Sequence, residues 1–414
     1  MPAWTPALPI RARPGREGEA WRLLVLLFTE ALSSYMLRPV VPLLAVALGA
    51  GPAIAGTLLA TQEAVSALVR IPAGAMAVVV GRRSVLLVCF VGGMLAAALF
   101  VLAPSIGWLF LAQVLWGAST ASFWPVQWAY LTDLAMPQQN AAVVGFGMGV
   151  SGLGLLVGPL AGGAAADAWG MRAPFALVGF LMVASFAVVW MLPRWTGRTA
   201  AGELLLLGAA RAGRRALAML RHRPVAASCA GSFINQTVDG ASTVFIPLQL
   251  HAAGLPIAAI GALITMRKAT TVLMRFLFPA LNRRLPLSAI VAAGFALDLG
   301  GLTAFALAGQ WWWLALAALV SGTGGGVGEP AAKTLVANST RDEQRDLGLS
   351  VEGTALVIGR ATGAVGLGVL AATAGVTSAM LAAMLMLAGL ATGVALWWRQ
   401  VERPRPAAAM AFGN

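Results

Sequence analysis

Apolar segments of membrane-spanning length follow one another through nearly the whole sequence. A bilayer core about 30 Å thick takes about 20 apolar residues per helix. Because backbone polar groups in lipid must bond to each other, such segments fold as helices. Twelve are predicted, at 22–48, 53–80, 84–103, 107–132, 141–166, 173–192, 225–250, 256–281, 286–308, 311–336, 346–371 and 374–398. The predicted fold class is therefore all-α, a polytopic membrane protein with twelve transmembrane helices.

The longest connection divides these segments into two sets of six. The predicted organisation is an N-terminal tail (1–21), an N-terminal bundle (22–192), a central loop (193–224), a C-terminal bundle (225–398) and a C-terminal tail (399–414). A weak repeat relates the sets. At an offset of 201 residues Arg82-Arg83 fall on Arg283-Arg284, and at 205 residues Gly154 and Gly158 fall on Gly359 and Gly363. Two pseudo-symmetric six-helix bundles are expected from such a repeat.

The net charge of +13 has two explanations, nucleic-acid binding or the excess of Lys and Arg in cytoplasmic loops. Position decides between them. Basic residues fill both tails, the central loop and the even-numbered connections, while the connections on the other side contain only Arg172. We expect a multi-pass protein of the plasma (inner) membrane with both termini cytoplasmic, the lipid bilayer as partner, and no nucleic acid.

The sequence lacks the groupings that catalysis or cofactor binding would need. Its two histidines, His222 and His251, stand alone, and neither Cys89 nor Cys229 follows a metal-ligand spacing. No G-x-x-x-x-G-K-[ST] run is present, which argues against ATP-driven transport by this chain. We expect no enzyme activity, no metal and no cofactor, with a proton gradient as the energy source.

Ionisable residues occur within the predicted spans in nearly equal numbers of each sign. Each costs about 3 kcal/mol or more at the bilayer centre unless it is paired or hydrated. The acidic ones are Glu30, Glu63, Asp239, Asp298, Glu329 and Glu352, and the basic ones are Arg38, Arg70, Arg267, Lys268, Arg275, Lys333 and Arg360. The near balance predicts pairing.

Residues of an antiparallel helical hairpin that lie at equal depth can be matched by counting outward from the turn, at a rise of about 1.5 Å per residue. Counting from Ala50 matches Glu30 with Arg70 and Arg38 with Glu63. The same procedure pairs Asp239 with Lys268, sets Glu352 level with Lys333 and Glu329, and brings Asp298 near Arg275, while Arg360 has no clear partner.

Two interpretations of these charges stay open: salt bridges that fix helix register, or a proton relay and substrate pocket. On the second, Glu30 and Glu352 are the preferred titrating acids, and Arg360 could hold an anionic group. The mid-membrane layer would be formed by Arg38, Glu63, Asp239 and Lys268, and a cytoplasmic-side network by Glu30, Arg70, Glu329, Lys333 and Glu352.

Polar and aromatic residues form stripes on two predicted helices. The seventh span carries Ser232, Asn235, Gln236, Asp239 and Thr243, and the fourth carries Trp116, Thr120, Phe123, Gln127 and Tyr130, with Trp124 and Trp128 beside them. Helical spacing puts each set on one face. The stripes indicate a partly wet central cavity with stacking surfaces, or alternatively helix–helix hydrogen bonding and an aromatic core.

The fifth span is unusually rich in glycine. Gly145, Gly154, Gly158, Pro159, Gly162 and Gly163 follow the spacing G-x8-G-x3-G-P-x2-G-G. Small residues let membrane helices approach closely, and a proline kink is tolerated where neighbouring helices accommodate it. This spacing resembles motif C of the major facilitator superfamily, which is associated with its proton-coupled antiporter branch. The resemblance implies a bent, tightly packed fifth helix at a rocking joint.

Other family motifs are altered. Gly74, Gly81, Arg82 and Arg83 fit the family's motif A, but Val78 stands where the family carries an acid that latches the halves. In motif B, the fourth-helix position of the usual arginine is Gln113. The resemblance implies a secondary transporter of alternating access, most simply a monomer that exports a small organic compound in exchange for protons. Open alternatives are a proton symporter or uniporter that imports a metabolite such as an anion, and a non-transporting sensor or partner protein.

Overall fold

A computed structural model describes residues 16–134, 140–193, 218–307, 309–340 and 342–402. Its helices are α1 (Glu17–Ala47), α2 (Pro52–Val80), α3 (Arg82–Leu102), α4 (Ile106–Leu134), α5 (Asn140–Trp169), α6 (Ala173–Trp190), α8 (Arg223–Ala252), α9 (Ile257–Asn282), α10 (Leu287–Leu307), α11 (Trp311–Ser339), α12 (Asp342–Ala374) and α13 (Val376–Glu402). Each corresponds to one predicted span, with ends that agree within about five residues. The all-helical prediction is confirmed for this part of the chain.

Ten of these helices are long and apolar enough to cross a membrane by length and composition. The two that fall short are α8 and α11, which carry polar residues and glycines along their length. Most of α8 is buried against helices on several sides, including α1, α11, α12 and α13. A helix that faces protein rather than lipid needs no apolar surface, so its polar stripe is compatible with a membrane location.

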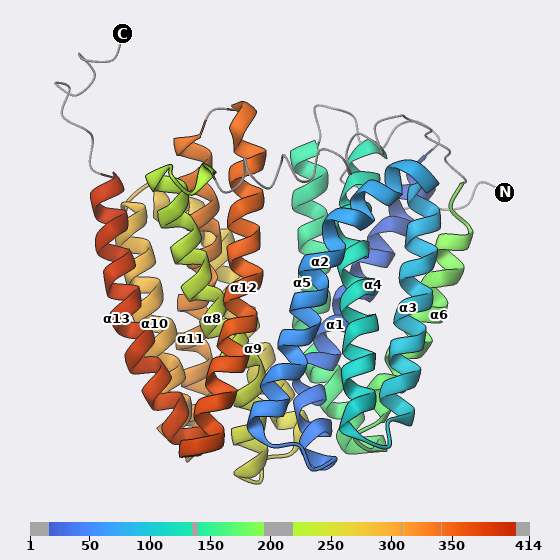
Figure 1. Ribbon diagram of the computed structural model, residues 1–414, viewed down its shortest axis with the longest axis horizontal. Helices are drawn as coiled ribbons and strands as arrows, with labels where there is room; N and C mark the ends of the chain where they lie inside the picture. The colour runs from blue at the N-terminus through green and yellow to red at the C-terminus, as the bar shows by residue number, and fades with distance from the viewer. Residues whose placement is uncertain (1–15, 135–139, 194–217, 308, 341, 403–414) are drawn as a thin grey trace.

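The helices form two groups side by side, α1–α6 in blue to green and α8–α13 in yellow-green to red (Figure 1). The start of α1 and the end of α13 lie at one end of the bundle, here called the termini end. The connections from α1 to α2 and from α8 to α9 lie at the other end, here called the opposite end. They contain Gly49 and Gly254, which have φ of +87° and +83°. Glycine adopts positive φ without a steric penalty, which explains its presence in these short connections.

The two halves touch through the helix pairs α2–α12, α5–α9, α1–α8 and α2–α8. The closest approaches lie toward the opposite end. A Cβ atom on Gly56 of α2 would overlap the carbonyl oxygen of Ala364 on α12, and one on Gly163 of α5 would overlap that of Ile257 on α9. Toward the termini end the ribbons of the two halves diverge (Figure 1). The halves are therefore held together at the opposite end.

The internal repeat is visible in the packing. Gly154 of α5 lies against the backbone of α1 at Leu32, and Gly359 of α12 lies against the backbone of α8 at Phe233. Gly158 contacts Met36 in the same way that Gly363 contacts Thr237. The offsets are those of the sequence repeat, 201 residues for the first helix of each half and 205 for the fifth. Each half thus builds the same close helix pair.

Candidate transport site

A mid-membrane ion pair joins the two halves. Arg360 of α12 donates from Nη1 to Oε1 of Glu63 on α2 at 3.1 Å, and both side chains are largely buried. Arg360 also donates from Nη2 and Nε to Oε1 of Gln236 on α8, at 2.7 and 3.1 Å. Its Nε lies 3.9 Å from Oδ2 of Asp239. Arg360 therefore links α2, α8 and α12 at the base of the region where the halves diverge.

Two pairing predictions are corrected here. Arg360 was expected to lack a partner, and Glu63 was expected to pair with Arg38. Depth matching within a hairpin gives height but not direction, and α2 packs closely against α12 of the other half. Glu63 consequently faces Arg360 rather than Arg38.

The predicted pair of Asp239 and Lys268 is confirmed, with Nζ 2.7 Å from Oδ1. The same oxygen lies 3.3 Å from Nη1 of Arg267. Arg267 reaches on to Oδ1 of Asp298 at 3.4 Å, and Ser321 Oγ bonds to both, accepting from Arg267 Nε at 2.9 Å and donating to Asp298 at 2.5 Å. Asp298 was expected near Arg275, so this is a further correction. The charged layer continues without a break from α2 through α12, α8 and α9 to α10.

A second cluster lies nearer the termini end. Glu329 of α11 accepts from Arg275 of α9 at 2.8 Å and from Lys333 one turn along its own helix. The side chains of Arg275 and Lys333 are 42% and 43% exposed, which makes these pairs weak contributors to stability. Glu352 was predicted to belong to this cluster, but it lies apart from it. It is fully buried and accepts a hydrogen bond from Ser232 of α8 instead.

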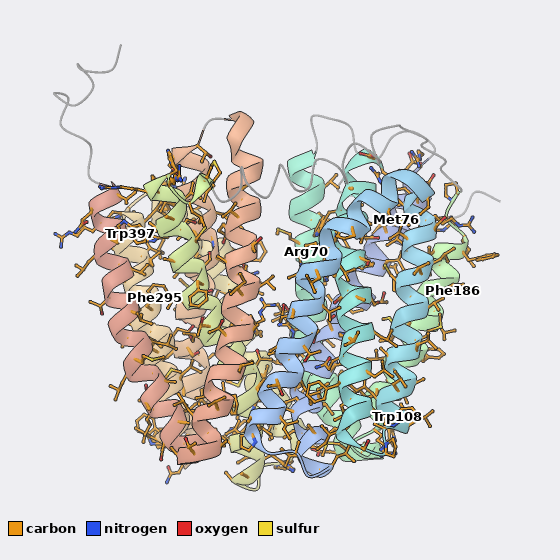
Figure 2. All side chains as sticks on the ribbon, in the orientation of Figure 1. Arg70, Met76, Trp108, Phe186, Phe295 and Trp397 are labelled. Atoms are coloured by element: carbon orange, nitrogen blue, oxygen red, sulfur yellow. The ribbon has the colours of Figure 1, made fainter. Side chains whose placement is uncertain are left out.

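Glu30 and Glu352 are buried acids with no ion-pair partner among the described residues. Glu30 is 1% exposed and accepts a hydrogen bond from Ser34 at 3.1 Å. Arg70, its predicted partner, is instead exposed, at the edge of α2 that borders the space between the halves (Figure 2). The Oε2 atom of Glu352 has no hydrogen-bond partner within the described structure. The predicted cytoplasmic-side network is thus divided into separate sites.

Arg38 is the one mid-membrane cation of the predicted layer that lacks a carboxylate within 4 Å among the described residues. Its guanidinium lies 4.4 Å from the centre of the Tyr35 ring. It lines two cavities of about 20 Å³ each, with Ser34, Gln62, Gln113 and Thr243 among the polar residues around them. A cavity of this size holds about one water molecule. Arg38 thus lies in a narrow polar region where the halves meet.

The two stripes have different surroundings. On α8, Ser232 bonds to Glu352, Gln236 bonds to Arg360, and Asn235 lies against Gly328 of α11. On α4 the predicted cavity face is corrected. Gln127 is buried and donates to the Leu23 carbonyl at 2.6 Å. Phe123 packs edge-on against Phe90 and Trp124, with distances between ring centres of 5.7 and 5.5 Å. Phe123 and Gln127 therefore belong to the core of the N-terminal half, as the alternative interpretation held.

The arginines of motif A bond within their own half. Gly81, with φ of +89°, makes the turn between α2 and α3. Arg82 pairs with Asp133 of α4 at 2.6 Å, and Arg83 donates to the Trp190 carbonyl at the end of α6 at 2.7 Å. The side-chain surroundings of Gly74, Val78 and Gly145 lie outside what the structure describes.

The fifth-helix glycines act as the motif implies. Gly154, Gly158 and Gly162 pack directly against the backbone of α1, where a side chain would clash. Pro159 and Gly163 face the other half, against Gly261 and Ile257 of α9. One helix therefore contacts its own half through one face and the opposite half through another.

Asp167, near the end of α5, joins the two halves, although no sequence pattern singles it out. Its Oδ1 and Oδ2 atoms accept the backbone N–H groups of Ile257 and Ala258, at 3.0 and 2.7 Å. These belong to the first turn of α9, whose N–H groups have no partner within the helix. Farther along the same helix pair, Thr265 donates to the Leu156 carbonyl at 2.9 Å. An acid near a helix end signals nothing about a partner helix 90 residues away, so only the fold identifies this cap.

Comparison with known proteins agrees with this architecture. The family model of the Major Facilitator Superfamily matches residues 23–297 and 228–411, which together span nearly the whole chain. The chain belongs to the Major Facilitator Superfamily. A curated relative, the MFS antiporter QDR3 of Candida albicans, is 36% identical over 113 residues, which is 26% of this chain and 16% of the relative.

Solved structures of three transporters share the fold. A bacterial homologue of the human lysosomal transporter Spinster, in an inward-facing and unoccupied conformation, has a TM-score of 0.78 at 17% identity and covers 96% of this chain and 100% of its own. The nucleoside transporter NupG has a TM-score of 0.76 at 14% identity and covers 93% of this chain and 100% of its own. The peptide transporter POT in complex with sulfate has a TM-score of 0.75 at 15% identity and covers 95% of this chain and 96% of its own. The chain thus belongs to a superfamily of membrane transporters rather than of enzymes, as expected.

Proposed function

We propose that this protein is a secondary active transporter that works by alternating access and exports a small organic compound in exchange for protons. It would act as a monomer in the plasma (inner) membrane. The excess of basic residues in the connections at the termini end supports a cytoplasmic location for that end. The halves are joined at the opposite end, so the conformation described here would be open toward the cytoplasm.

The observation that carries this proposal is the ion pair between Glu63 and Arg360. It spans the junction of the halves, so α2 and α12 cannot separate at the opposite end without breaking it. A buried charge left without its partner costs several kcal/mol. Substrate or a proton that compensates for the broken pair would lower this cost. Binding in the central region would thereby become coupled to the change of access.

Glu30 and Glu352 support proton coupling. Each is buried and bonds to a serine rather than to a cation in the described part of the chain. A carboxylate in such a place is costly when it is charged, and binding a proton removes that cost. We propose these two acids as the proton carriers, one in each half.

Transport by purified protein in liposomes tests direction and coupling. The substrates for this assay come from comparing export by loaded cells with and without the gene. Exchange for protons predicts that substrate moves against its gradient when protons are supplied from the other side of the membrane. Flux that ignores an imposed pH gradient would reject proton coupling. Substrate-induced thermal stabilisation without any flux would instead favour a sensor.

Arg38 favours a second candidate, a symporter or uniporter that carries an anionic metabolite. Glu63 is bound by Arg360, and Asp239 by Lys268 and Arg267, which leaves Arg38 without a carboxylate among the described residues. Its free guanidinium could bind a carboxylate or phosphate of the substrate. Reversal of the pH gradient distinguishes the candidates, because a symporter accumulates substrate on the side to which protons flow.

A further inference from the structure

A groove of about 920 Å³ lies between α10 and α13, away from the charged layer. Small residues of both helices line it, including Ala292, Ala296 and Gly300 on α10 and Ala391 and Ala395 on α13. Larger apolar side chains, among them Phe295, Leu381 and Met384, line much of the remaining wall, together with Ser288, Thr303, Thr392 and Arg399. No acidic residue of the described chain lines it. Space left by small side chains between two packed helices can hold an elongated apolar molecule.

The groove faces outward from the C-terminal half. In Figure 1, α13 forms the edge of the molecule farthest from the N-terminal half, with α10 next to it. Asp298 shows which way α10 is turned, because it bonds to Arg267 and Ser321 inside the half. The groove therefore lies behind the helix that carries this part of the charged layer, on the side open to lipid.

The groove is long enough to hold a lipid acyl chain. Its lining on α13 runs from Leu381 to Arg399, about 27 Å at 1.5 Å per residue. One leaflet contributes about 15 Å to a hydrocarbon core of about 30 Å. An acyl chain of a lipid in the leaflet at the termini end could therefore lie in the groove over its whole length.

The mouth of the groove is positively charged. Arg399 lines it at the termini end, and Pro286 lines it from the start of α10. Arg283 and Arg284 are exposed in the turn that leads to Pro286. None of the three arginines forms an ion pair with a described residue. A basic site between transmembrane helices at the level of the headgroups is suited to an anionic lipid phosphate.

We propose that this groove binds one anionic phospholipid, with an acyl chain between α10 and α13 and the phosphate at Arg399, Arg283 and Arg284. The site is separate from the transport pathway, so it does not depend on the direction or coupling of transport. Bound lipid would cover apolar surface of both helices. Trp398, which is buried and donates to the Ala227 carbonyl of α8 at 2.7 Å, anchors α13 beside the mouth.

Native mass spectrometry of the purified full chain tests this proposal with equal amounts of phosphatidylglycerol and phosphatidylcholine that have the same chains. The wild type is expected to retain one phosphatidylglycerol in preference. R399Q should lower that preference about fivefold, with further loss in the R283Q/R284Q/R399Q variant. R221Q is the matched control, an exposed arginine that does not line the groove.

Groove-filling variants separate this site from charge effects elsewhere. A292F and A395L each narrow the groove and should reduce the retention of both lipids. The comparison uses whichever of the two variants keeps the unfolding temperature of the wild type. An unchanged lipid preference in the triple arginine variant would overturn the proposal. So would full lipid retention in a folded groove-filling variant. If the wild type were a dimer and A292F a monomer, the groove would be an interface with a second copy of the protein. That result would also overturn the proposal.

Discussion

Arg360 and Glu63 form an ion pair at 3.1 Å although they lie 297 residues apart and belong to different halves. The pair sits between the closed contacts at the opposite end and the diverging helices at the termini end. It is surrounded by further charges that pair among themselves on α8, α9 and α10. From this position we expect the pair to break when access to the site alternates, as proposed above.

R360Q should destabilise the protein more than E63Q. Without Arg360, Glu63 is a buried carboxylate with no cation, which costs about 3–5 kcal/mol. Without the Glu63 charge, Arg360 still has Gln236, with Asp239 nearby. Thermal unfolding in detergent measures the order. The control is R275Q, which leaves Glu329 paired with Lys333 in a more exposed cluster. An equal decrease in unfolding temperature in all three variants would contradict this prediction.

D167N should favour opening at the opposite end. The change replaces one of the two oxygens that accept the first N–H groups of α9 with an amide that donates. Loss of a helix cap costs about 1 kcal/mol, and this cap joins the halves. A cysteine at Ala53, which packs against Gly368, should react faster with a membrane-impermeant maleimide in D167N. D133N, which alters the pair with Arg82 within one half, should leave that rate unchanged.

G163A should impair transport, whereas G152A on the same helix should not. A Cβ at Gly163 would overlap the backbone of α9 at Ile257, so the halves could not close in the same way. Gly152 has no atom within 4 Å of the equivalent position. Alanine there should add up to about 1 kcal/mol of helix stability. Flux in liposomes with both variants at equal protein levels is the measurement, and equal flux would contradict the role of this contact.

E30Q and E352Q should uncouple transport from protons without abolishing substrate exchange. The amide keeps the size of the acid and can still accept from Ser34 or Ser232, but it cannot carry a proton. Counterflow of labelled substrate should persist in both variants, while accumulation driven by a pH gradient is lost. Wild-type accumulation in the double variant would exclude these acids as proton carriers.

The sequence was sufficient to predict the helices and the repeat, since bilayer thickness fixes helix length and Gly154 and Gly359 recur at matching positions. It also predicted the pair of Asp239 and Lys268, which lie on consecutive helices at equal depth. It did not predict that Glu63 turns to Arg360, because depth says nothing about which neighbour a helix face meets. That neighbour is set by packing between the halves.

Two other features could not be predicted from the sequence for the same reason, because they depend on how distant helices pack. The stripe with Phe123 and Gln127 could have faced water or another helix, and only packing places it in the core of one half. Asp167 carries no local pattern that names α9 as its partner. Contacts between distant helices are what the sequence of a single chain leaves undetermined.

The most direct test measures distances across the α2–α12 interface with spin labels at Ile54 and Thr373, near the opposite end. Alternating access predicts one short distance in the resting wild type and a second, longer one when substrate or protons bind. E63Q should raise the longer population without ligand, because the pair that holds α2 to α12 is gone. A single unchanged distance in wild type and E63Q, with and without substrate and across pH, would contradict alternating access controlled by Glu63 and Arg360.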